Sequence, residues 1–102
     1  MAETVTALLP LVKRALNITW ESEETELRLN DLIADAVPTL RFKLGAPEGF
    51  DFSAPSPARN LLLTYCRYGY NGMAEQFDDA YAQDLLSVRA AFLVGVELSD
   101  EA

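Results

Sequence analysis

The 102-residue chain contains no histidine, one cysteine, and eight basic residues against sixteen acidic ones. A single thiol excludes a disulfide framework, and the absence of histidine leaves a zinc site without its usual ligands. Cys66 also has no partner base of the kind that a catalytic thiolate needs, and we expect it to be a buried, inert thiol. The net charge of −8 argues against ordinary nucleic-acid binding, which relies on clustered lysine and arginine.

Long apolar runs and catalytic motifs are missing as well. No run reaches the roughly 18 residues that span a bilayer, and the opening MAETVTALLPLVKR lacks the charge pattern and cleavage site of a signal peptide. There is no glycine-rich phosphate loop, HExxH, nucleophile elbow or CxxC. Asp78 and Asp79 are adjacent, so on a helix they point about 100° apart and do not converge as a catalytic dyad. We expect no enzyme activity, cofactor, metal site or membrane partner.

Half of the residues are hydrophobic, which indicates a folded chain rather than a disordered one. Its length suits one domain, residues 1–102, with flexible ends at 1–4 and 96–102. The central element of this domain is a helix at 57–71, PARNLLLTYCRYGYN. Ser56 is a suitable N-cap, Pro57 suits the first helical position, and Asn71-Gly72 suits a C-cap.

Apolar periodicity predicts three further helices, within 4–16, from 22 to 44 and from about 74 to 95. Pro10 either kinks the first helix or marks its start, and Pro38 should kink or split the second. The stretch 45–57, GAPEGFDFSAPSP, is rich in proline and glycine and is predicted to be a long loop. The fold class is therefore all-α, a small bundle of about four helices around the central one.

Two predicted helices carry a second apolar stripe on the side away from the core, which suggests contact with another molecule. In the loop, Phe50 and Phe52 either fold over the bundle or contact another chain. These positions form our candidate interface with other subunits or a partner protein: Leu27, Ala34, Phe42, Phe50, Phe52, Leu86, Ala90 and Leu93.

The order of these elements resembles a known family. The chain has a short LLPLVKRALNIT, an acidic helix start SEETELRLNDLIADAV, a Gly/Pro loop, the helix PARNLLLTYCRYGYNG and a final DLLSVRAAF. From about Leu9 to Phe92 this pattern is similar to the head–tail connector proteins of tailed double-stranded DNA phages, which are also called head-completion or adaptor proteins. The chain lacks the basic or aromatic-proline ending that many relatives carry around the final arginine, Arg89.

The resemblance implies a structural virion protein, made in the host cytoplasm and located at the head–tail junction. It implies a ring, commonly twelve-fold, beneath the portal protein and next to a stopper or tail-completion protein. Genomic DNA would pass through the ring without specific binding. An acidic chain suits a conduit that must let DNA slide.

A second hypothesis is a soluble, acidic regulatory or inhibitor module that mimics DNA and binds a basic partner protein. Such a mimic needs a ladder of carboxylates along one face. Here the acidic residues are spread over helix starts and loops, which favours the connector.

Overall fold

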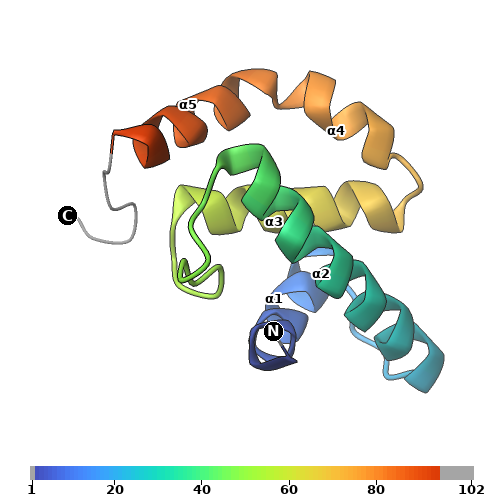
Figure 1. The fold of residues 1–102 in the computed structure, drawn as a ribbon. Helices are drawn as coiled ribbons and strands as arrows, with labels where there is room; N and C mark the ends of the chain where they lie inside the picture. The colour runs from blue at the N-terminus through green and yellow to red at the C-terminus, as the bar shows by residue number, and fades with distance from the viewer. Residues whose placement is uncertain (1, 95–102) are drawn as a thin grey trace.

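The computed structural model describes residues 2–94, and this part of the chain is all-helical, as predicted (Figure 1). It contains five helices rather than about four. The predicted flexible end at 96–102 lies outside the described residues, whereas residues 2–4 belong to the first helix. The helices are α1 (Ala2–Ala15), α2 (Glu23–Leu44), α3 (Pro57–Tyr70), α4 (Ala74–Ala80) and α5 (Ala82–Leu93).

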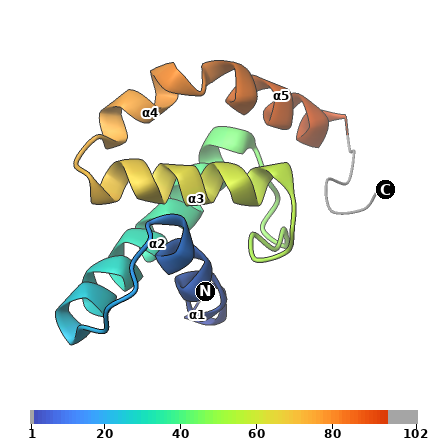
Figure 2. The ribbon, with the colours of Figure 1, turned by 180° about the vertical axis from the view of Figure 1, so that it is seen from behind.

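The helix α3 is central, because it packs against each of the other four helices. In Figures 1 and 2, α4 and α5 arch along one side of α3, α1 lies on its opposite side, and α2 crosses it. The helices therefore do not line up in parallel as in an up-and-down bundle. They cross one another around a shared core, which leaves the outer faces of α2 and α5 at the surface.

Local signals place the ends of α3 as predicted. The hydroxyl oxygen of Ser56 accepts a hydrogen bond from the backbone N–H of Arg59 at 3.1 Å, and Pro57 is the first helical residue. Gly72 follows the helix with φ of 72°, a left-handed conformation that glycine adopts without steric cost. Ser22 caps α2 in the same way, accepting from Thr25 N–H at 3.3 Å.

The two prolines do not interrupt their helices. Pro10 lies inside α1, so this helix begins well before it. Pro38 lies inside α2, which continues to Leu44, so the helix does not split there. Both prolines are exposed. The carbonyl that each leaves without its helical partner is therefore on the solvent side, where water can satisfy it.

The predicted last helix is broken at Tyr81 into α4 and α5. Tyr81 has φ of −121° and ψ of 26°, outside the helical range, although its N–H still donates to Phe77 at 2.9 Å. The Tyr81 ring stacks on Phe77, with centroids 5.3 Å apart, and meets the edge of Tyr68 at 5.8 Å. This aromatic cluster holds the bend that lets α4 and α5 follow α3.

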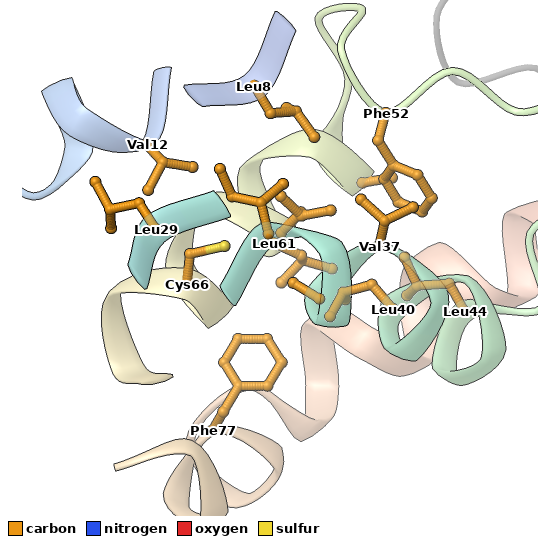
Figure 3. Close-up of a cluster of buried hydrophobic side chains, with 14 of the residues drawn as sticks. Leu8, Val12, Leu29, Val37, Leu40, Leu44, Phe52, Leu61, Cys66 and Phe77 are labelled. Atoms are coloured by element: carbon orange, nitrogen blue, oxygen red, sulfur yellow. The ribbon is translucent and has the colours of Figure 1, made fainter. Parts of the chain in front are cut away.

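The core is a single cluster of apolar side chains from all five helices and the loop (Figure 3). Helical periodicity predicts eight core residues, of which four are buried and four are partly buried and pack against the core. The buried ones are Leu29, Ile33, Leu61 and Leu62, and the partly buried ones are Tyr65, Tyr81, Leu85 and Phe92. The fully buried large side chains are Phe52, Phe77, Leu8, Leu29, Ile33, Leu40, Leu44, Leu62, Val12, Val37 and Cys66.

Candidate functional site

The outer face of α2 carries exposed apolar side chains where the sequence predicts a second stripe. Leu27 is 60% exposed, Phe42 is 84% exposed, and Ala34 between them is also exposed. The stripe is interleaved with the exposed carboxylates of Asp31 and Asp35. Phe42 is the largest apolar side chain on this face. It is also more exposed than any other large hydrophobic residue in the described part of the chain.

The outer face of α5 is a second apolar surface. Leu86 is 62% exposed and Leu93 is 76% exposed, and Ala90 lies between them. Val88, on the opposite side of the same helix, is buried in the core. The two stripes of α5 therefore do not share one core, and the outer one has no intramolecular cover.

The two loop phenylalanines have different environments, and this corrects the candidate interface. Phe52 is fully buried, so it belongs to the core of this chain and is not available to a partner. Phe50 is half-buried. Its ring meets Phe52 and Phe92 edge to face, each at a centroid distance of 5.0 Å. Only Phe50 of this pair is accessible from outside.

The loop that carries these rings is held by hydrogen bonds. The Nη1 atom of Arg41 donates to the carbonyl oxygens of Pro47 at 2.7 Å, Glu48 at 3.2 Å and Phe50 at 3.4 Å. Its guanidinium also lies over the Phe52 ring, 5.3 Å from the centroid. One arginine at the end of α2 therefore fixes the path of the loop and the position of its buried phenylalanine.

A short turn completes the loop. The carboxylate of Asp51 accepts hydrogen bonds from the hydroxyl of Ser53 at 2.6 Å and from its backbone N–H at 2.9 Å. These two bonds stabilise the ionised form and lower the pKa of Asp51 from its ordinary value. Arg59 on α3 donates to the Ser53 carbonyl at 3.2 Å, which ties the turn to the central helix.

A second arginine joins α5 to the end of α2. The Nη1 atom of Arg89 donates to the carbonyl oxygens of Lys43 at 2.9 Å and Phe42 at 3.4 Å. Both carbonyls are in the last turn of α2, at the negative end of the helix dipole. The Phe42 carbonyl also accepts a hydrogen bond from the N–H of the capping Gly45 at 3.3 Å. A salt bridge from Lys43 to Asp78 at 2.8 Å ties the same turn to α4.

These contacts surround an open groove of about 810 Å³ between the end of α2, the loop and Arg89. The groove brings together Phe42 and Phe50, two of the candidate interface residues. Its charged lining is mixed, since it contains two arginines and two carboxylates. The lining residues are Pro38, Arg41, Phe42, Gly45, Ala46, Glu48, Gly49, Phe50, Asp51 and Arg89.

A smaller hollow of about 330 Å³ lies between α3 and α5, at the bend that follows α4. Leu61 and Val88, which are buried, contribute to its apolar part together with Pro57 and Tyr81. Its polar lining consists of Asn60, Thr64, Asp84 and Ser87. The sequence alone does not predict this hollow, because its two walls come from helices that are distant in the sequence.

Within the described residues, the structure contains no group of three or more histidine, cysteine, aspartate or glutamate side chains that could hold a metal ion. Cys66 is buried, as expected, and burial raises the pKa of its thiol to about 12. None of the described helices has the length and apolar character needed to cross a bilayer. The surface features that could contact a partner are thus the two stripes, the groove and the hollow.

The role of Arg41 was not predicted, although the sequence contains a signal for it. Arg41 stands four residues before the capping Gly45, so its side chain lies beside the start of the loop. Arg89 appeared in the sequence only as the end of a family-like motif. Comparison of the chain with protein-family models, curated proteins and solved structures gave no match.

Proposed function

We propose that the protein is a ring-forming head–tail connector of a tailed phage, a structural component of the virion and not an enzyme. The observation that carries this proposal is the pair of outward apolar stripes on α2 and α5. Phe42, Leu86 and Leu93 are each more than 60% exposed in the single chain. A surface of this kind on a small domain marks a protein–protein contact.

The placement of the stripes on different helices suits a ring. A closed ring uses a head-to-tail contact in which one patch of each subunit meets a different patch of the next. A two-fold dimer would need only one self-complementary patch. With stripes on α2 and on α5, the chain offers one surface for a neighbouring subunit and another for a further neighbour or for the portal protein.

The charge of the chain supports the same function. Each copy carries a net charge of −8, so a ring of about twelve copies would surround its channel with an excess of negative charge. DNA binding depends on the release of counterions by lysine and arginine. An acidic ring does not retain DNA in this way, and the genome can slide through it. Its neighbours would be the portal protein on one side and a stopper or tail-completion protein on the other.

The experiment that tests this proposal is assembly with the portal protein encoded in the same genome. The purified chain, with and without the portal, is examined by sedimentation velocity and negative-stain electron microscopy. We expect a ring of fixed copy number stacked on the portal, and none on the portal of an unrelated phage. If the chain stays monomeric in every mixture and instead binds a basic DNA-binding protein with strong salt dependence, the inhibitor hypothesis replaces this one.

A further inference from the structure

We propose that α4 and α5 are the two halves of one helix that switches between a bent and a straight form. In the bent form, which the structure shows, α5 packs on α2 and the loop (Figure 1). In the straight form, residues 74–93 are one continuous helix and α5 leaves α2. The switch is a property of the single chain. Its use in assembly, where it would redirect the outer stripe of α5 towards a partner, rests on the proposed function.

The sequence of this segment favours a continuous helix. Residues 74–93, AEQFDDAYAQDLLSVRAAFL, contain neither glycine nor proline, and most of them are good helix formers. The apolar positions also keep one helical period across the break, at Phe77, Tyr81, Leu85, Val88 and Phe92. A break without a local cause indicates that tertiary contacts impose it. Local preference and the observed fold therefore disagree at this point, as they do in segments with two accessible forms.

The hydrogen bonds at the break are those of a helix that has opened over one turn. The Tyr81 N–H donates to the Phe77 carbonyl and the Leu85 N–H donates to the Tyr81 carbonyl, each at 2.9 Å and with α-helical spacing. Between these two bonds, in residues that the structure describes, the N–H groups of 82–84 make no backbone hydrogen bond to the carbonyls of 78–80. Each of these three donors stands four positions after one of these three acceptors, so straightening pairs them one to one.

The bent and straight forms are close in hydrogen-bonding energy. Residues 78–80 and 82–84 are all exposed, so water can satisfy their backbone groups in the bent form. Straightening exchanges these bonds to water for helical bonds, and the net gain of such an exchange is small. Tertiary contacts of similar size can therefore hold the bend, and their loss can release it.

Few contacts hold α5 against the rest of the chain. Val88 is the only buried residue of α5. Phe92 meets Phe50 of the loop edge to face at 5.0 Å, and Arg89 donates to the Lys43 carbonyl of α2 at 2.9 Å. The open hollow between α3 and α5 also shows that α5 does not close completely over α3. The second half of the segment is thus weakly held, as a switching element must be.

Two substitutions that release α5 test the switch. Arg89→Met removes the donors to the end of α2, and Tyr81→Leu removes the ring that stacks on Phe77 while favouring helix at the break. The amides of 82–84 should exchange freely in the wild type. In the double variant we expect them to gain roughly tenfold protection, which corresponds to about nine straight molecules in ten. Hydrogen exchange followed by NMR measures each amide.

A distance measurement gives an independent result. Spin labels are attached through Glu75→Cys and Leu93→Cys, which are exposed positions on α4 and α5, whereas the native Cys66 is buried and stays unlabelled. A straight helix places the two labelled Cα atoms about 27 Å apart, from its rise of about 1.5 Å per residue. The bend shortens this distance, so release of α5 should move the distance distribution to the longer value.

A third substitution should lock the bent form. Gln83→Pro removes the middle one of the three donors, and its ring would clash with the carbonyl four residues earlier in a continuous helix. In the bent form it lies in the first turn of α5, where proline is tolerated. Added to the two releasing substitutions, it should restore the shorter distance. Gln83→Ala is the matched control, since it keeps the amide and should leave the released form straight.

The outcomes separate a switch from simple loosening of the helix. The inference is wrong if the releasing variant stays bent, with 82–84 unprotected and the distance unchanged. It is also wrong if α5 melts, so that 88–92 lose protection while 82–84 gain none. Circular dichroism and the protection of α3 show that each variant is folded. Each substitution is also measured alone, so that Arg89→Met, at an exposed site, decides the question if the pair unfolds.

The fate of the switch can be separated from that of the connector role, because its test needs no portal protein. A chain that straightens but ignores the portal would retain the switch and contradict the proposed function. A chain that assembles on the portal but stays bent in the releasing variant would retain the function and contradict the switch.

Discussion

The Nη1 atom of Arg89 lies 2.9 Å from the carbonyl oxygen of Lys43 and joins the middle of α5 to the last turn of α2, 46 positions away in the chain. The guanidinium satisfies an end carbonyl that has no helical partner and offsets the negative end of the helix dipole. The same bond positions Phe42, the most exposed large apolar residue described. One side chain therefore contributes both to the packing of α5 on α2 and to the presentation of the candidate interface.

We expect Arg89→Met to lower the free energy of unfolding by about 1 kcal/mol. The substitution keeps much of the side-chain length but removes the charge and the donors. A hydrogen bond from a charged donor is therefore lost at an exposed site. Arg67→Met, at an exposed position of α3, is the control and should change stability by less than about 0.5 kcal/mol. Urea denaturation measures both. Equal effects of the two substitutions would mean that Arg89 does not join α5 to α2.

Phe52 and Phe42 form a matched pair of phenylalanines with opposite environments, fully buried and 84% exposed. Phe52→Ala should lower the free energy of unfolding by about 3–5 kcal/mol, because it removes a ring from the core and leaves a cavity. Phe42→Ala should change it by less than about 0.5 kcal/mol at concentrations where the chain is monomeric. Denaturation of both variants distinguishes them, and a small effect of Phe52→Ala would place the loop outside the core.

The loop shows how far the sequence could predict the structure. Ser56, Pro57 and Gly72 act locally, so the ends of α3 follow from their residue types. The sequence places Phe50 and Phe52 on either side of Asp51 but does not show which of the two rings is buried in the core. That choice depends on Arg41, which fixes the loop from another element.

Other differences from expectation have similar causes. Tyr81 has no glycine or proline beside it, and at the break its ring packs against Tyr68 of α3, a contact that no local pattern encodes. Pro38 is tolerated inside a continuous α2, although proline usually interrupts a helix, because its side of α2 faces solvent. The outward stripes could be predicted because helical periodicity alone defines them, whereas the hollow required the relative placement of α3 and α5.

Burial of Cys66 predicts a dependence of stability on alkaline pH. The pKa of its thiol is raised from an ordinary value of 9.0 to about 12 in the folded chain. Because the pKa of the thiol is higher in the folded chain than in the unfolded chain, its contribution to stability is complete below the unfolded pKa. This contribution is lost as the pH rises towards the folded pKa. Between about pH 9 and 12 the unfolded chain releases a proton that the folded chain keeps, which lowers stability by about 1.4 kcal/mol per pH unit.

The measurement compares urea denaturation of the wild type and of Cys66→Ala at several alkaline pH values. The substitution removes a buried side chain and lowers stability at neutral pH, but the later decline with pH should be shallower than in the wild type. At neutral pH, a thiol reagent should modify the wild type only after unfolding. Rapid modification of the native protein would contradict the buried, inert thiol.

The outer face of α5 provides the sharpest prediction about assembly. Leu86→Glu combined with Leu93→Glu should leave the monomer folded, because both side chains are largely exposed and a carboxylate on a solvated surface costs little. The same double variant should abolish assembly of the connector. An unpaired carboxylate buried in an interface costs several kcal/mol, and a closed ring repeats this penalty at each subunit. Electron microscopy with the portal measures assembly, and circular dichroism measures folding.

The charge-matched control is Gln76→Glu with Thr19→Glu, which adds two carboxylates at exposed positions on α4 and in the connector before α2, away from the outer stripe of α5. This control should assemble normally, so that loss of assembly in the stripe variant reflects the position of the charges and not their number.

Loss of portal binding with intact self-association would assign the stripe to the portal, whereas loss of both would assign it to the neighbouring subunit. Unfolding of the monomer by the stripe variant would mean that both sides of α5 are internal. Normal rings from a folded stripe variant would exclude this face from assembly and leave α2, with Phe42, as the surface that joins the subunits.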